Sequence, residues 1–228
     1  LQAGQGIDIR MSPLVFKVNA AYSRITEVLP GLYVSGVTAL REELLRFYRI
    51  TVIINATTEV PNLALQTIKG EKLWLEDSSE QYAHDNFDPY CDEIEMALHS
   101  GERVLVHSVK GISRSATLCL AYLTKYKFES LKEAFLFLAS KRPLVRPNIG
   151  FWSQLIASEQ EVKKTSGSVH LIRDKSDPDK VVPDVYSYSL AALKDANRKR
   201  QNITNRPFLT KRYKPVLEPI LEDVENSV

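Results

Sequence analysis

The chain has 228 residues, of which 44% are hydrophobic and 25% are charged, and its formal net charge is +2. This composition is that of a globular protein and excludes wholesale disorder, collagen and coiled coil, and no apolar run reaches the ~18 residues that would predict a membrane span. Two cysteines, Cys91 and Cys119, are too few for a disulfide scaffold or a four-cysteine zinc site, and they favour a reducing compartment.

Residues 1–10 carry no signal-peptide pattern and precede Met11, and we interpret them as an expression scar. Residues 11–21 are interpreted as an N-terminal segment that precedes the domain. From residue 22 to about residue 162, short apolar runs alternate with helical patterns. Strands are predicted at residues 32–34, 51–55, 73–75 and 103–107, and helices at residues 39–47, 88–99, 115–125, 131–141 and 149–162. This alternation predicts one α/β domain over residues 22–162.

Several predicted elements carry a local signal. The uninterrupted, β-branched run Thr51–Asn55 is typical of a strand that is buried on both faces. Asp88–Pro89 predicts an N-cap and a first helical residue, and Ser130–Glu133 matches a capping box. Asn148 can cap the last helix. Both cysteines fall within predicted helices, where we expect them to belong to the core.

Residues 163–228 form a basic C-terminal extension with 13 Lys+Arg and 9 Asp+Glu, whereas residues 1–162 hold 17 and 19. Several prolines and few apolar runs predict that this extension is only partly ordered. Its basic clusters, Arg198–Arg200 and Lys211–Arg212, are interpreted as a solvated face rather than as a nucleic-acid site.

The most informative segment covers residues 107–115, between the predicted strand and the apolar helix that follows it. A short loop from a buried strand into a helix N-terminus points backbone N–H groups inward, which favours an anion. Gly111 can take the positive φ that such a turn often needs, and Arg114 offers a planar fork to two phosphate oxygens. The Gly-Lys-Ser/Thr ending of a nucleotide-binding P-loop is missing, which disfavours ATP and GTP.

His-Ser-Val-Lys-Gly-Ile-Ser-Arg-Ser at residues 107–115 resembles the signature loop of the cysteine-based protein tyrosine phosphatases, His-Cys-x-x-Gly-x-x-Arg-Ser/Thr. The form Gly-Ile-Ser-Arg-Ser-Ala-Thr, together with Ile54–Asn62 and Arg146–Leu155, resembles the small atypical dual-specificity branch. Val182–Tyr186 is similar to a C-terminal extension in one subgroup of that branch. The resemblance implies an α/β fold with a central, largely parallel, twisted sheet of about five strands flanked by helices.

Site residues are carried over from this resemblance one position at a time. The implied phosphate-binding loop is Ser108, Val109, Lys110, Gly111, Ile112, Ser113 and Arg114, supported by His107 and Asn148. Arg114 would also stabilise the transition state, Asp77 would be the general acid, and Ser115 would donate to the departing thiolate. Asp85 and Asp88 are rival carboxylates that we interpret as N-caps, and a plain N-cap explains Asn148 nearly as well.

The family's nucleophilic cysteine aligns with Ser108. A thiol at a helix N-terminus has a lowered pKa, whereas a serine hydroxyl without an adjacent base stays protonated and weakly nucleophilic. The chain as written is therefore expected to bind phosphate and barely turn it over. Ser108 is either an engineered replacement of cysteine, which the interpretation of residues 1–10 favours, or the natural residue of a pseudophosphatase.

We predict a protein phosphatase that hydrolyses phosphotyrosine and phosphoserine/threonine through a cysteinyl-phosphate intermediate, here inactive at Ser108. The alternative is a natural pseudophosphatase that binds phosphoproteins; phosphoinositide, RNA 5′-end or glycogen phosphate substrates are disfavoured because Lys110 is the one basic residue at a variable loop position. Expected partners are phosphorylated proteins and a phosphate- or sulfate-like anion in the loop, without nucleic acid. We expect no metal or organic cofactor and an intracellular location, cytoplasmic, nuclear or both.

Overall fold

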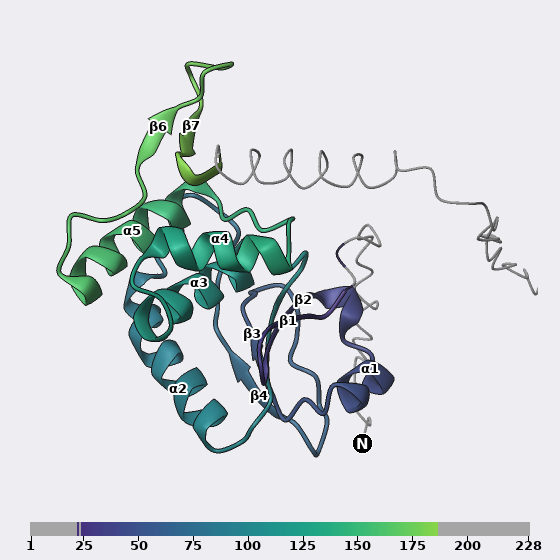
Figure 1. Cartoon of the computed structure of the whole chain (residues 1–228). Coiled ribbons are helices and arrows are strands. Elements are labelled where there is room, and N and C mark those ends of the chain that lie inside the picture. Colours follow the sequence, from purple (N-terminus) through teal and green to yellow (C-terminus); the bar gives the residue numbers. More distant parts are fainter. Residues whose placement is uncertain (1–21, 23, 187–228) are drawn as a thin grey trace, which may run out of the picture. The chain divides into compact units, whose positions relative to one another are not determined.

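A five-stranded sheet forms the centre of the computed structural model, which describes residues 22 and 24–186 (Figure 1). Its strands, in spatial order, are β1 (Thr26–Leu29), β2 (Leu32–Gly36), β5 (Val104–Ser108), β3 (Val52–Asn55) and β4 (Lys69–Lys72). β1 is antiparallel to β2, and the other neighbouring strands are parallel. The predicted α/β fold with a largely parallel sheet is thereby confirmed.

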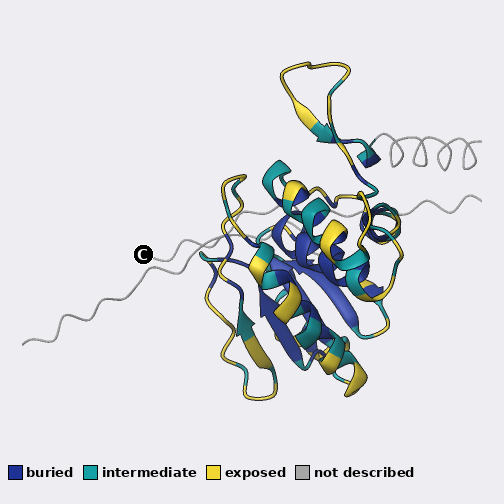
Figure 2. Cartoon of the chain, turned by 90° about the vertical axis from the view of Figure 1, so that its left-hand side faces the viewer, coloured by how far each residue is buried: buried dark blue, intermediate teal, exposed yellow. Residues whose placement is uncertain are grey.

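Helices cover both faces of this sheet. One face carries α2 (Phe87–His99), α3 (Arg114–Tyr126), α4 (Leu131–Lys141) and α5 (Ile149–Lys163), and the other carries α1 (Glu42–Phe47) (Figure 1). Every residue of β2, β3 and β5 is buried, as Figure 2 shows, and this confirms that residues 51–55 contain a strand enclosed on both faces. β4 is an edge strand with exposed residues.

Side-chain alternation along β5 divides the core into two clusters. Val104 and Val106 pack in the cluster beneath the four helices, and Leu105 packs in the smaller cluster on the α1 face. Continuing the alternation, Ser108 belongs to the face covered by the four helices, and His107 belongs to the α1 face. Both cysteines are buried beneath those helices, as predicted.

Two of the predicted helix caps are confirmed. The Glu133 backbone N–H donates to Ser130 Oγ at 3.2 Å, and the Phe151 N–H donates to Asn148 Oδ1 at 3.0 Å. The Asp88 cap is wrong, because α2 begins at Phe87 directly after a 3-10 turn, His84–Asn86, and has no side-chain cap. That turn leaves no extended residue before α2 whose side chain could fold back onto its first N–H groups.

Asp85 and Asp88 have other partners. Asp85 Oδ1 accepts a hydrogen bond from the Tyr82 hydroxyl at 2.8 Å, and Asp88 Oδ1 accepts one from Lys125 Nζ at 3.0 Å. Their interpretation as N-caps is therefore wrong.

The strand predicted at residues 73–75 is also wrong. β4 ends at Lys72, and although the Leu73 N–H still donates to Asn55 O at 3.0 Å, β3 ends there and offers no further partner. Leu73 and Leu75 are nevertheless buried, so the apolar pattern reports burial rather than strand pairing. The helix predicted at residues 39–47 is shorter, because a 3-10 turn at Val37–Ala39 precedes α1.

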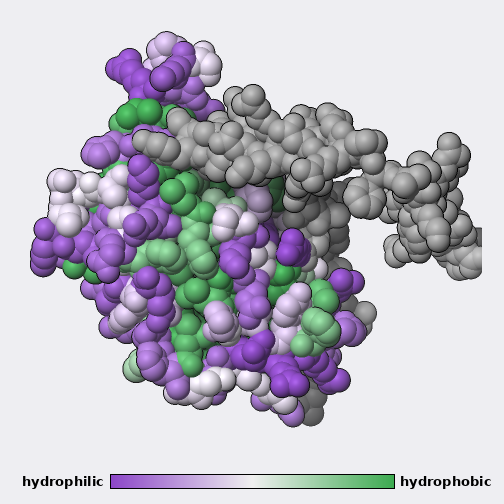
Figure 3. Space-filling model, viewed as in Figure 1, coloured by the Kyte–Doolittle hydropathy of each residue, from purple (hydrophilic) through white to green (hydrophobic). Residues whose placement is uncertain are grey.

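Beyond α5, a hairpin of β6 (Leu171–Arg173) and β7 (Val181–Pro183) follows. Val169 and Val185, on either side of the hairpin, pack into the same core as the helices. Apolar side chains reach the surface on the face where α4 lies (Figure 3).

The predicted segments at residues 1–21 and the basic clusters at residues 198–200 and 211–212 lie outside the described residues. None of the helices within residues 24–186 is long and apolar enough to cross a membrane.

Candidate active site

The loop of residues 109–113 connects Ser108, the last residue of β5, to Arg114, the first residue of α3. Both of these residues are buried, with 2% and 4% exposure. Gly111 has a φ of 69°, as predicted, and a Cβ atom there would lie 2.4 Å from the Ser35 carbonyl carbon. The loop therefore needs glycine both for its backbone conformation and for its packing against β2.

Four successive carbonyl oxygens of this loop are bonded from outside it. The Val37 N–H donates to Val109 O at 3.0 Å, and the Arg146 N–H donates to Ile112 O at 2.7 Å. Arg142 donates through Nη2 to Lys110 O at 3.1 Å and through Nε to Gly111 O at 2.7 Å. Because the carbonyls are held outward, the intervening N–H groups are directed to the inner side of the loop. Arg142 was missed by sequence reasoning, since nothing in its local sequence marks it as a partner of the loop.

Ser108 lies at the base of this loop. Its Oγ is 3.0 Å from Ser115 Oγ and accepts a hydrogen bond from the Gly111 N–H at 3.2 Å. Neither partner is a base that could remove the hydroxyl proton. The surroundings of Ser108 Oγ therefore favour a negative charge at this position without activating the serine.

His107 lies next in sequence but belongs to the other face of the sheet. It is 1% exposed, and its Nδ1 has no hydrogen-bond partner among the described residues. Burial lowers the pKa of the imidazole to about 4, with the Lys72 and Arg114 charges adding to the effect, so the ring is neutral at pH 7. Among the described residues, no hydrogen bond joins the His107 ring to Ser108 Oγ, whose partners are Ser115 Oγ and the Gly111 N–H.

Arg114 is held on one side of its guanidinium. Nη1 donates to Glu59 Oε2 at 2.8 Å and to Leu75 O at 3.2 Å, whereas the buried Nε has no hydrogen-bond partner among the described residues. An arginine binds two phosphate oxygens through parallel N–H groups, and the Nε edge is one such pair. The guanidinium is thus held through Nη1, and its Nε makes no hydrogen bond among the described residues.

Asp77, which the family resemblance implies as the general acid, lies beside the loop. Its Oδ1 accepts hydrogen bonds from Ser113 Oγ at 2.6 Å and from Asn148 Nδ2 at 3.1 Å, and its Oδ2 is 3.9 Å from Arg114 Nε. Asn148 also donates its backbone N–H to Ser113 Oγ at 3.2 Å. The structure therefore brings Asp77, Ser113, Arg114 and Asn148 together, and Asn148 reaches the loop through Ser113.

The segment that carries Asp77 is fixed against α5. Gln154 Oε1 accepts the N–H groups of Ala83 at 2.6 Å and His84 at 3.0 Å, and Gln154 Nε2 donates to Gln81 O at 2.8 Å. A Cβ atom on Gly150 would lie 1.9 Å from Ser79 O, so only glycine permits this approach. Gln154 and Gly150 lie in the Arg146–Leu155 motif, but no role for either was predicted.

The buried His107 predicts a pH dependence of stability. Because its pKa is about 4 in the fold and about 6.5 when unfolded, its contribution is fully present above pH 6.5 and is lost as pH falls through 4. The free energy of unfolding should fall by about 2 kcal/mol from pH 7 to pH 5 through this residue. Denaturant titrations at both pH values check this, and His107→Gln should be less pH-dependent by that amount. An equal dependence in both proteins would contradict it.

No cluster of three metal-ligating side chains occurs within the described part of the chain.

Comparisons with known proteins agree on one family. The family "Dual specificity phosphatase, catalytic domain" matches residues 32–161. Dual specificity protein phosphatase 18 of Homo sapiens is 37% identical over 175 residues, which cover 76% of this chain and 90% of the relative.

Two solved structures add to this comparison. The crystal structure of a mouse protein described as a dual specificity phosphatase, complexed with zinc tungstate, is similar with a TM-score of 0.60 and 31% identity over 65% of this chain and 94% of that chain. The crystal structure of human tyrosine phosphatase-like serine/threonine/tyrosine-interacting protein is similar with a TM-score of 0.56 and 27% identity, covering 60% and 96%.

Proposed function

Because this chain belongs to the dual specificity phosphatase family, we propose that its loop of residues 108–114 receives the phosphate group of phosphotyrosine, phosphoserine or phosphothreonine in proteins. The observation that carries this proposal is the buried Arg114 Nε at the N-terminus of α3, which has no hydrogen-bond partner among the described residues and lies 3.9 Å from Asp77 Oδ2. A buried N–H donor without a hydrogen bond is costly, and an anion in the loop would supply the missing acceptor. The tungstate in the complex of the mouse relative is an oxyanion like phosphate, which supports the same ligand class here.

With cysteine at position 108, the reaction would follow from the geometry of the neighbouring groups. The thiolate would attack phosphorus, and the P–O bond to the leaving oxygen would break while Asp77 gives that oxygen a proton. Arg114 and the inward N–H groups would stabilise the charge on the transferred phosphoryl group. A water would then attack the cysteinyl phosphate, giving a proton to the Asp77 carboxylate, and Ser115 Oγ would donate to the departing thiolate.

With serine at position 108, the first step of that reaction lacks a nucleophile. We propose that Ser108 replaces a catalytic cysteine and that the chain therefore binds phosphate without turnover. The alternative is a natural pseudophosphatase that binds phosphoproteins. The similarity to the human tyrosine phosphatase-like serine/threonine/tyrosine-interacting protein favours this alternative. The codon at position 108 of the natural gene separates the two, because a serine codon belongs to the pseudophosphatase alone.

Binding of phosphopeptides tests the proposal on the chain as it stands. Calorimetry with peptides of one sequence, carrying phosphotyrosine, phosphothreonine or no phosphate, should detect only the phosphorylated forms, and tungstate should displace them. Arg114→Lys should weaken the binding roughly 100-fold, because a point charge cannot replace the fork. Arg41→Lys, at an exposed arginine, is the matched control and should change nothing.

Two outcomes would count against the proposal. Equal affinity for the peptide without phosphate would remove the phosphate from recognition. Equal tungstate affinity in Arg114→Lys would mean that another group binds the oxyanion.

A further inference from the structure

The segment of residues 57–62, between β3 and β4, is fixed by several hydrogen bonds. Asn55 Nδ2 donates to Val60 O at 2.8 Å and to Asn62 Oδ1 at 2.9 Å, and Thr57 Oγ1 donates to Asn55 Oδ1 at 2.7 Å. Lys72 Nζ also donates to Val60 O. Since Asn55 ends β3 and Lys72 ends β4, this segment is tied to two strands of the sheet and has a defined position.

This braced segment presents Glu59 to Arg114. The carboxylate is itself oriented, because Glu59 Oε2 accepts the backbone N–H and the hydroxyl of Thr58, each at 3.1 Å. The same oxygen accepts Arg114 Nη1 at 2.8 Å. Leu75 O accepts Nη1 as well, so both contacts engage a single nitrogen of the guanidinium.

We infer that Glu59 is a positioning residue for oxyanion capture: its carboxylate fixes the Arg114 guanidinium through Nη1 and leaves the Nε edge directed at the phosphate site. This inference rests on the proposed function. A guanidinium on a long side chain has many rotamers, and fixing one of them before the ligand arrives removes an entropic cost from binding.

A carboxylate beside an arginine can instead compete with the ligand. The geometry argues against competition by Glu59, because Glu59 contacts Nη1, whereas the buried Nε carries no hydrogen bond among the described residues and has Asp77 Oδ2, not Glu59, at 3.9 Å. Glu59 also stays ionised across the working pH range. Its partial burial alone would raise the pKa of the carboxyl, but the hydrogen bond and charge of Arg114, together with hydrogen bonds from the backbone and the Thr58 hydroxyl, lower the pKa to about 2.

The two roles predict opposite signs, and tungstate binding to the Ser108 chain separates them. Removing a nearby negative charge should strengthen anion binding if charge alone matters. If Glu59 positions Arg114, Glu59→Ala should weaken tungstate binding by about tenfold or more, and Glu59→Gln, which keeps an acceptor oxygen, should fall between Ala and Glu. Glu76→Gln is the control, because Glu76 is an exposed carboxylate on the Asp77 segment that makes no hydrogen bond to Arg114.

Denaturant titration of the same variants excludes a general loss of structure, and Glu59→Gln keeps the test valid if Glu59→Ala is poorly folded. Weaker binding in folded Glu59→Gln, with Glu76→Gln unchanged or tighter, is the expected result. Unchanged or tighter tungstate binding in both Glu59 variants would overturn the positioning role while leaving the proposed function intact. Failure of the unsubstituted chain to bind tungstate would overturn both.

Discussion

A Ser108→Cys variant is expected to hydrolyse an aryl phosphate at least about 1,000-fold faster than the chain with Ser108. The reason is the environment at the end of β5, where the Gly111 N–H and Ser115 Oγ lie within 3.2 Å of the side-chain oxygen and where the Arg114 cation and the α3 N-terminus are adjacent. These groups stabilise a thiolate and lower the pKa of a thiol, but no base lies in contact with the serine hydroxyl. Initial rates with p-nitrophenyl phosphate, with and without vanadate, measure the difference.

Two controls assign any restored activity to the loop. Ser108→Ala should be as inactive as the Ser108 chain, because neither supplies a nucleophile. Ser108→Cys combined with Arg114→Lys should lose most of the gain, since the thiolate then lacks the phosphate fork. A folded Ser108→Cys variant without vanadate-sensitive turnover would contradict the phosphatase hypothesis and favour the phosphoprotein-binding alternative.

The strand–loop–helix geometry of residues 104–126 could be predicted from sequence because it is local. A buried strand, a short turn with Gly111 and an apolar helix are adjacent in the chain, and each has its own pattern. The caps at Ser130 and Asn148 were predicted for the same reason, because a cap and the N–H group it accepts lie three residues apart. Predictions were wrong where the outcome depends on a distant partner, as at residues 73–75, which lose pairing because β3 ends at Asn55.

The supporting groups of the site could not be predicted for the same physical reason. Glu59 reaches Arg114 across 55 residues of chain, and Arg142 reaches Gly111 across 31. No spacing rule connects such pairs, because only the folded sheet brings them together. Arg142 resembles any charged residue at the end of a helix, where a solvated side chain is the ordinary expectation. Arg142 is instead buried at the end of α4, where it donates hydrogen bonds to the Lys110 and Gly111 carbonyls of the loop.

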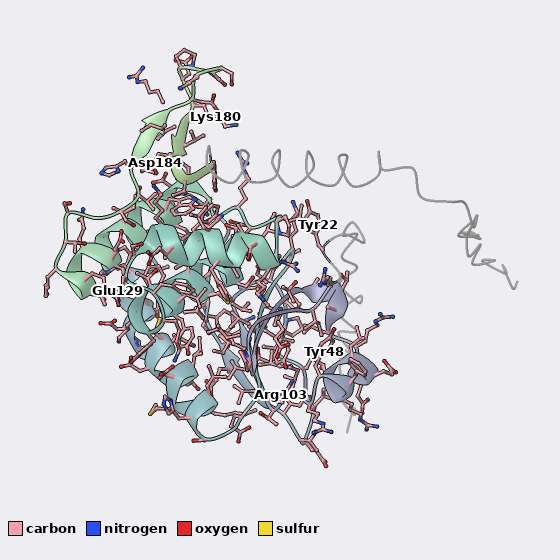
Figure 4. The ribbon with its side chains drawn as sticks, in the orientation of Figure 1. Tyr22, Tyr48, Arg103, Glu129, Lys180 and Asp184 are labelled. Carbon is pink, nitrogen blue, oxygen red and sulfur yellow. The ribbon has the colours of Figure 1, made fainter. Side chains whose placement is uncertain are left out.

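Replacing Arg142 is expected to have the second large effect. Arg142 is 3% exposed, and its guanidinium donates to Gly111 O at 2.7 Å, to Arg24 O at 2.9 Å and to Thr26 Oγ1 at 3.0 Å. It also donates to Lys110 O and to the carbonyl of Tyr22, which lies near the end of α4 (Figure 4). Arg142→Met should lower the free energy of unfolding by roughly 3–5 kcal/mol, because it leaves the buried Gly111 carbonyl and three partly buried carbonyls without this donor.

The same change should weaken tungstate binding, because the Lys110 and Gly111 carbonyls would be free to rotate inward and would meet the anion with negative rather than positive dipoles. Denaturant titration and calorimetry on one preparation measure both effects. Lys141→Met is the matched control, since Lys141 is the neighbouring exposed cation and donates to none of these carbonyls. If Arg142→Met keeps both the stability and the tungstate affinity of Lys141→Met, the outward carbonyls do not depend on Arg142, and the loop must hold its inward N–H groups by its own backbone conformation.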